Sequence, residues 1–213
     1  PWTDKALCSR FSKNQPQGKQ KCKSALQTAL GLEQSEERPV AAVISRLTNQ
    51  KGLDLFRAVI PGLLDLGAQL VILGMGDAEY ERMFADLAAI NPSSVAFHAE
   101  MNDSLARQIY AGADIFLMPS AFEPCGLSQL LAMRYGAIPV VRETGGLADT
   151  VIPYNRFTDE GTGFSFRNYS ADELYNASRA AIELYCGDKA AWQRLTARAM
   201  AADFGWSRSA GEY

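Results

Sequence analysis

The sequence contains a single histidine and only four cysteines, none of them in a Cys-x-x-Cys pair. A zinc cluster needs several such ligands at close spacing, so these counts argue against one. No apolar run approaches the roughly 18 residues that cross a bilayer, and the N-terminal region has no signal-peptide core. Basic residues are not in excess, with 21 Lys and Arg against 24 Asp and Glu. We therefore expect neither a membrane nor a nucleic acid as a partner.

The rest of the composition is that of an ordinary globular protein. The 213 residues are 47% hydrophobic and 21% charged, which is enough to bury a sizeable core, and the net charge is −3. The scattered cysteines favour a reducing compartment, because a domain of this size does not need disulfides. The chain starts at Pro1, without a methionine, and we expect it to be a piece of a longer protein.

Short apolar runs rich in β-branched residues alternate with helical patterns from residue 40 onward. Such runs are typical of strands buried on both faces of a parallel sheet. Alternating strands and helices predict an α/β fold with a Rossmann-like, doubly wound parallel sheet and helices on both faces. The predicted strands are 40–44, 69–73, 94–97, 114–118, 137–141 and 164–166.

The flanks of this alternating region are predicted to be helical. We expect one domain over 1–213, in which 1–38 form a linker and a leading helix and 188–213 form a closing helix and a tail. The predicted flanking helices are 18–32, 172–185 and 189–202, the last two separated by Gly187.

The first candidate binding loop follows the first predicted strand. Ligands bind doubly wound sheets beyond the carboxyl ends of the strands, so each loop at that edge is a candidate site. Here Arg46 and Lys51 flank a polar turn that leads into a helix. A helix N-terminus attracts anions, and Arg and Lys add direct contacts to phosphate. The loop predicts a phosphate-binding site; two solvated surface charges are the alternative.

A second candidate loop follows the fourth predicted strand. Glu123 stands there before Pro124 and Gly126, where a carboxylate has no packing purpose. A carboxylate in this place is suited to sugar hydroxyls, while the start of the next helix, with Ser128 as an extra donor, is suited to a phosphate. The alternative is that Glu123 accepts hydrogen bonds from the N–H groups of that helix.

Glycine-rich turns follow two further strands. Gly74 and Gly76 come after the second strand, and Gly145 and Gly146 come after the fifth. Paired glycines allow close approach of the backbone to a ligand and can form an anion-binding nest, although an ordinary tight turn needs them too. Four loops at one predicted edge thus carry residues suited to phosphate or sugar, and this conjunction favours a nucleotide-sugar site.

These loops resemble one family closely. The motifs are similar to those in the C-terminal half of bacterial glycogen synthases and plant starch synthases, and the resemblance covers nearly the whole chain. The segments that carry it are Ser45-Arg46-Leu47 with Gln50-Lys51-Gly52, Phe122-Glu123-Pro124-Cys125-Gly126-Leu127-Ser128-Gln129, and Thr144-Gly145-Gly146-Leu147-Ala148-Asp149.

The resemblance implies a glycosyltransferase of the GT-B fold, of which this chain is the C-terminal, nucleotide-binding lobe. Such enzymes transfer glucose from ADP-glucose to the nonreducing end of an α-1,4-glucan, with retention of the anomeric configuration. The implied ligands are ADP-glucose and ADP, with the glucan bound through a missing N-terminal lobe and no metal required. The implied compartment is the cytoplasm of a bacterium or the plastid stroma of a plant. We expect this fragment to have little or no activity alone.

Carried over to this sequence, the resemblance gives each motif residue a role. Arg46 and Lys51 hold the diphosphate, and Glu123 binds the hydroxyls of the donor glucose, which makes these three the catalytic residues. The residues implied to line the rest of the pocket are Cys125, Gly126, Leu127, Ser128, Thr144, Gly145 and Gly146.

Two positions depart from the family pattern. Met101 stands where the family usually places an aromatic that stacks on adenine, and a thioether can also pack on a base. Leu131 stands where many retaining relatives carry a second glutamate.

Other functions remain open at this point. Another GT-B transferase, a sugar-nucleotide epimerase and a noncatalytic nucleotide-binding module all fit a Rossmann-like sheet. A nicotinamide dehydrogenase is disfavoured, because Glu79 occupies the place of the third fingerprint glycine after Gly74 and Gly76.

Overall fold

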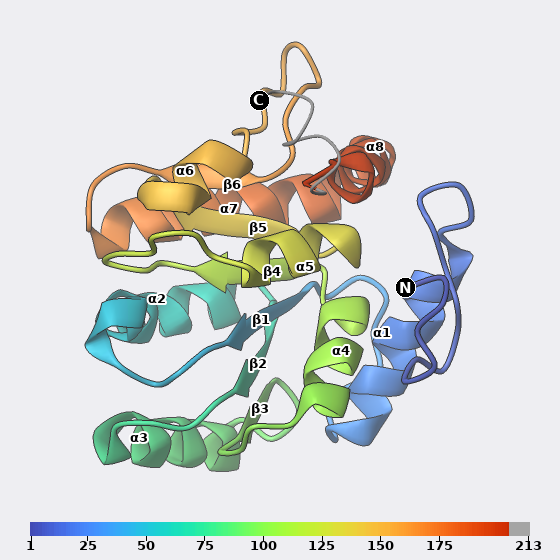
Figure 1. Ribbon diagram of the computed structural model, residues 1–213. Helices are drawn as coiled ribbons and strands as arrows, with labels where there is room; N and C mark the ends of the chain where they lie inside the picture. The colour runs from blue at the N-terminus through green and yellow to red at the C-terminus, as the bar shows by residue number, and fades with distance from the viewer. Residues whose placement is uncertain (205–213) are drawn as a thin grey trace.

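Six parallel strands form one sheet in the computed structural model, which describes residues 1–204 (Figure 1). The strand order is β3-β2-β1-β4-β5-β6, so the chain reverses its direction of growth between β1 and β4. This order is that of a doubly wound sheet, as predicted, and its ligand-binding crevice is expected where the direction reverses. The strands are β1 (Val40–Ile44), β2 (Gln69–Leu73), β3 (Val95–His98), β4 (Ile115–Met118), β5 (Ile138–Arg142) and β6 (Phe164–Phe166).

The predicted strand bounds agree closely with those observed. β1, β2 and β6 begin and end where the apolar runs do, and β3, β4 and β5 differ by one residue at one or both ends. His98 and Arg142 each end a strand although both are polar. The backbone of each pairs with the neighbouring strand, His98 with Leu73 and Arg142 with Phe166, and this pairing is invisible to an apolar pattern.

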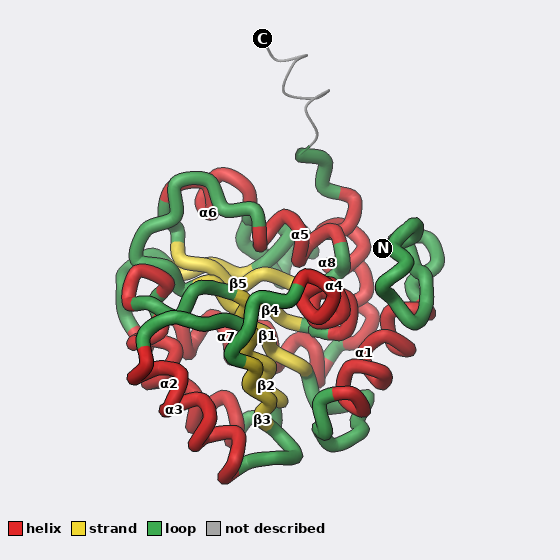
Figure 2. The backbone as a smooth tube through the Cα atoms, turned by 60° about the horizontal axis from the view of Figure 1, so that its bottom comes forward, coloured by secondary structure: helices red, strands yellow, loops and turns green. Residues whose placement is uncertain are grey.

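Helices cover both faces of the sheet (Figure 2). α2 packs against α7 on one face, with α3 beside β3, while α1 packs against α4 on the other, with α5 against α8. None of the helices in residues 1–204 combines the length and apolar character that crossing a bilayer requires. The α-helices are α1 (Gln17–Ala29), α2 (Leu53–Asp65), α3 (Ala78–Ile90), α4 (Asp103–Gly112), α5 (Ser128–Arg134), α6 (Gly145–Thr150), α7 (Ala171–Gly187) and α8 (Lys189–Ala201).

Several helix ends differ from the prediction by one to three residues, and two of them have a clear physical cause. α1 stops at Ala29 rather than at residue 32, because Gly31 has a φ of 71° and the Leu32 N–H turns back to donate to the Gln27 carbonyl at 2.9 Å. Gly187 does not separate the last two helices, since it belongs to α7. Asp188 separates them instead, and its side chain accepts a hydrogen bond from the Ala191 N–H as the cap of α8. The predicted tail beyond residue 204 lies outside the described residues.

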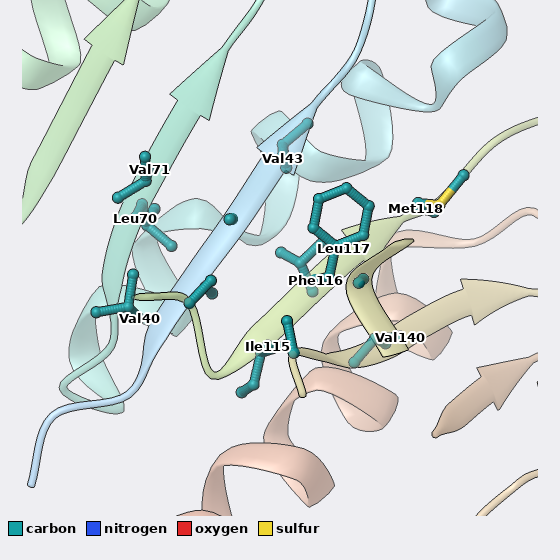
Figure 3. Close-up of a cluster of buried hydrophobic side chains, with 14 of the residues drawn as sticks. Val40, Val43, Leu70, Val71, Ile115, Phe116, Leu117, Met118 and Val140 are labelled. Carbon is teal, nitrogen blue, oxygen red and sulfur yellow. The ribbon is translucent and has the colours of Figure 1, made fainter. Parts of the chain in front are cut away.

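The central strands supply the core of the domain (Figure 3). Side chains on both faces of β1, β2 and β4 are buried, among them Val40, Leu70 and Phe116. Each such side chain stabilises the fold by roughly 1.5–3 kcal/mol relative to exposure. The rigid core fixes where each strand ends, and therefore where the loops beyond those ends lie.

A buried ion pair fastens the amino-terminal edge of the sheet. The Lys23 ammonium of α1, only 1% exposed, lies 2.9 Å from the Asp114 carboxylate, just before β4. Lys23 also donates to the Arg38 carbonyl at 2.6 Å and to the Tyr185 hydroxyl at 2.6 Å, while Asp114 accepts from the Val40 N–H at 2.9 Å. This cluster joins α1, α7 and the starts of β1 and β4 at the edge opposite the candidate loops.

Candidate functional site

The loop between β1 and α2 is anchored by Leu47 and carries the exposed Arg46. Leu47 is fully buried under it, and a short 3-10 helix, η1 (Asn49–Lys51), turns the chain toward α2. Arg46 is exposed, and no hydrogen bond or ion pair joins its side chain to any other residue in the range 1–204. Its guanidinium thus stands free for an incoming anion.

The structure brings Lys51 and Glu123 together. The Lys51 Nζ atom lies 2.6 Å from Glu123 Oε2, although the two residues belong to loops after different strands. Both side chains are largely shielded, with 19% and 13% of their surface exposed. The alternative that Glu123 caps its own helix is not what the structure shows, because its carboxylate is paired with Lys51. A cation and a carboxylate at one point are suited to hold a phosphate and sugar hydroxyls respectively.

Gly52 allows the two loops to meet. It has a φ of 71°, and a Cβ atom there would lie 2.0 Å from the Pro119 carbonyl oxygen at the end of β4. A side chain of any size would therefore separate the Lys51 loop from the Glu123 loop. The Ala121 N–H reinforces the contact by donating to the Gln50 carbonyl at 2.9 Å.

We expect Gly52→Ala to unfold at clearly lower denaturant than Gly31→Ala. Both positions have a φ of 71°, so both substitutions incur a left-handed strain of about 1–2 kcal/mol. No atom lies within 4 Å of a Cβ at Gly31, whereas the Cβ at Gly52 meets backbone. Equal midpoints for the two variants in urea would show that the loops can separate without cost.

The loop between β4 and α5 runs between α2 and α6 (Figure 1). Cys125 is exposed, Gly126 has a φ of 69°, and Leu127 is 72% exposed. Ser128 is the first residue of α5, and its hydroxyl interacts with that of the buried Tyr110. Burial raises the pKa of Tyr110, and the hydrogen bond to Ser128 opposes this effect only in part. Ser128 therefore interacts with Tyr110 within the protein, whereas Cys125 and Leu127 are exposed.

Gln129 was not singled out from the sequence, yet it shapes this loop. Its side chain is fully buried, and Nε2 donates to the Gly126 carbonyl at 2.9 Å and to the Thr150 hydroxyl at 3.1 Å. The Oε1 atom is buried without a partner among the described residues. The signal that could have identified it is its place three residues after Gly126, within reach of the carbonyls of the turn.

The glycines after β5 approach the Glu123 loop rather than open space. A Cβ atom at Gly145 would lie 2.2 Å from the Glu123 carbonyl oxygen, and one at Gly146 would lie 2.1 Å from that of Cys125. The Gly146 N–H donates to the Pro124 carbonyl at 3.1 Å. Thr144, the residue before α6, is extended and half-buried. The paired glycines thus pack against the backbone of the Glu123 loop. Neither the anion-binding nest nor the tight turn considered above predicts this contact.

The remaining candidate, Met101, lies apart from these contacts. It follows β3 and is 80% exposed.

Gly74, after β2, lies at the same edge of the sheet. A Cβ atom there would lie 1.8 Å from the Ser45 carbonyl oxygen. Among residues 1–204, no three His, Cys, Asp or Glu side chains come together in a way that could hold a metal ion. The carboxyl edge offers the exposed Arg46, the paired Lys51 and Glu123, and closely packed backbone, which are groups suited to an anion and to hydroxyls.

Comparison with known proteins places the chain in a family. The sequence profile described as "Glycosyl transferases group 1" matches residues 31–198, most of the chain. The chain belongs to this glycosyltransferase family. Its sheet and flanking helices are those of a GT-B glycosyltransferase, as expected.

Members of the family with assigned names are similar over the whole chain. A glycogen synthase of Exiguobacterium sibiricum is 50% identical and one of Caldicellulosiruptor saccharolyticus is 49% identical, each over 100% of this chain. The matched region is 44% of the first relative and 45% of the second, so the chain spans somewhat less than half the length of these relatives.

Solved structures show the same arrangement. The catalytic domain of starch synthase IV from Arabidopsis thaliana, bound to ADP and acarbose, superposes with a TM-score of 0.93 at 38% identity. The match covers 100% of this glycosyltransferase chain and 45% of that one. A sucrose-phosphate synthase from Thermosynechococcus elongatus, with a TM-score of 0.66 at 24% identity, shares the fold.

Proposed function

We propose that this chain is the nucleotide-sugar-binding half of a retaining glucosyltransferase that moves glucose from ADP-glucose to the nonreducing end of an α-1,4-glucan. The observation that carries the proposal is the meeting of Lys51 and Glu123 at the carboxyl edge of the sheet, with the free Arg46 in the same loop as Lys51. Similarity to glycogen synthases over the whole chain supports the choice of reaction. The domain is proposed to span 1–213, and a further lobe supplies the glucan groove.

In this proposal the two cations hold the diphosphate of the donor. Cleavage of the glycosyl–phosphate bond leaves ADP with additional negative charge. Preorganised cations stabilise that charge where it develops, without the reorganisation that water would need. Lys51 and Arg46 are assigned this task, and no metal ion is required for it.

Glu123 is assigned to the hydroxyls of the donor glucose. In the chain without ligand its carboxylate neutralises Lys51. A bound diphosphate replaces Glu123 as the principal partner of Lys51, and Glu123 is then available to accept from sugar hydroxyls. Cys125, Gly126, Leu127 and Ser128 border the sugar and the distal phosphate, with Thr144, Gly145 and Gly146 behind them and Met101 on the base. The reaction would take place in the bacterial cytoplasm or the plastid stroma, where donor and glucan meet.

Calorimetric titration of the chain with ADP, UDP, GDP and NAD tests the proposal. We expect ADP to bind weakly but measurably better than the other three, and Arg46→Ala to weaken it further through the loss of one phosphate contact. Lys13→Ala, an exposed lysine before α1, serves as the control for loss of charge. A preference for UDP or GDP would favour another GT-B transferase, and binding of NAD would favour a dehydrogenase.

A further inference from the structure

Arg142, at the end of β5, holds backbone rather than ligand. Its Nε atom donates to the Ser120 carbonyl at 2.9 Å, and Nη2 donates to the Ala121 carbonyl. On the other side Nη1 reaches the Arg167 carbonyl at 3.5 Å, just beyond β6. A guanidinium has five donors in a fixed plane, so it can hold several carbonyl oxygens at set positions. Here it joins the ends of three neighbouring strands.

The segment that Arg142 holds leads directly to Glu123. Ser120 is buried, and the Ala121 N–H donates to the Gln50 carbonyl in the Lys51 loop at 2.9 Å. Ala121 is therefore fixed from both sides, at its N–H by the Lys51 loop and at its carbonyl by Arg142. Glu123, whose carboxylate pairs with Lys51, follows this fixed point by only two positions in the sequence.

Tyr169 braces the same guanidinium from outside. Its ring centroid lies 5.7 Å from the Arg142 guanidinium carbon, in a cation–π contact. Its hydroxyl donates to Asp54 Oδ1 at 2.5 Å and lies 3.4 Å from the Asn49 carbonyl, on the two sides of Lys51 in sequence. Burial, followed by the hydrogen bond to Asp54, raises the pKa of Tyr169, so the hydroxyl remains a donor at neutral pH.

We propose that Arg142, braced by Tyr169, is a positioning residue that sets the Glu123 carboxylate against Lys51 and so fixes the geometry of the donor-glucose site. The inference rests on the proposed function and deepens it, since it adds a residue that touches neither sugar nor phosphate. Its guanidinium is engaged by backbone carbonyls, whereas the Arg46 side chain is free. Arg142 and Arg46 thus have different tasks.

Kinetics of the full-length enzyme that contains this chain test the assignment. Arg142→Ala is expected to lower kcat with ADP-glucose about 30-fold while the Kd for ADP, which lacks the sugar, stays within about twofold. A displacement of about 1 Å in a catalytic group is enough for a loss of this order. Arg142→Lys is expected to recover part of the loss, because the ammonium can still reach one carbonyl. The control is Arg179→Ala, which removes an exposed arginine lying 5.9 Å from the Tyr175 ring in α7 and is expected to change neither value.

A double-variant cycle distinguishes positioning from a general structural role. If Arg142 acts through Glu123, Arg142→Ala should cost less than about threefold in kcat when Glu123→Gln is already present. The same 30-fold cost in both backgrounds, or an unchanged kcat in the single variant, would overturn the inference. Tyr169→Phe provides a milder variant should Arg142→Ala not fold, with an expected threefold to tenfold loss of kcat and unchanged ADP affinity.

Hydrogen exchange tests the same contacts in the chain without any donor. Arg142→Ala should accelerate exchange of the amides between residues 119 and 127, and Arg179→Ala should not. Unchanged exchange in both variants would overturn the inference whatever the substrate proves to be. A wild-type enzyme inactive with ADP-glucose would instead contradict the proposed function, so the two failures are distinguishable.

Discussion

Replacement of Lys51 by alanine in the full-length enzyme that contains this chain is expected to lower turnover with ADP-glucose about 100-fold. In the proposed function the variant loses the cation paired with Glu123, and with it about 3 kcal/mol of stabilisation of the charge that develops on the leaving diphosphate. It also leaves the shielded Glu123 carboxylate without its partner at 2.6 Å, which repels the incoming donor. The measurement is kcat at saturating donor and glucan.

The matched variants separate these two effects. Lys51→Ala combined with Glu123→Gln removes the unpaired carboxylate, so donor affinity should partly return while kcat stays low. Arg46→Ala is expected to cost a factor similar to that of Lys51→Ala, because the proposed function assigns the second cation to the same diphosphate. Lys13→Ala should leave turnover unchanged. A Lys51→Ala enzyme with kcat within threefold of wild type would contradict the role given to this lysine.

The second large effect concerns stability at the opposite edge of the sheet. Lys23→Met is expected to lower the free energy of unfolding by about 3–5 kcal/mol, because it leaves the Asp114 carboxylate buried without its cation. The Arg38 carbonyl and the Tyr185 hydroxyl lose a partner in the same variant. Urea unfolding followed by circular dichroism measures the change.

Adding Asp114→Asn to Lys23→Met should recover part of this loss, since no unpaired charge then remains buried. Arg57→Ala is the control, because it removes an exposed ion pair with Glu79 at 3.0 Å and is expected to leave the unfolding midpoint nearly unchanged. Equal shifts of the unfolding midpoint in Lys23→Met and Arg57→Ala would contradict a large contribution of the Lys23–Asp114 pair to the free energy of unfolding.

The sheet could be predicted from the sequence because its strands are buried on both faces. Val40–Ile44 and Gln69–Leu73 are runs with hardly a polar residue, and such runs have few other stable placements in a globular protein. The same regularity predicts that Lys51 and Glu123 lie at one edge, since both follow carboxyl ends of parallel strands. Their direct pairing needs the actual lengths and turns of two loops, which no periodicity encodes.

The supporting residues could not be predicted in the same way. Arg142 and Gln129 act on backbone carbonyls, and a carbonyl has no side-chain signature in the sequence. Gly145 and Gly146 were expected at a turn or beside a ligand, but the atoms that exclude a Cβ there belong to the neighbouring loop. Lys23 and Asp114 carry charges, and a charged residue is expected at the surface unless its partner, 91 positions away, is known.

The separation of the Lys23–Asp114 cluster from the Lys51–Glu123 pair has a practical consequence for protein engineering. The two lie at opposite ends of the same strands. Within residues 1–204 the hydrogen bonds and the ion pair of the Lys23 and Asp114 side chains join α1, α7, β1 and β4 and do not involve the loops at the carboxyl edge. Substitutions around Lys23 and Asp114 are therefore expected to change heat tolerance, while substitutions in the loops that follow β1, β4 and β5 are expected to change the proposed donor preference.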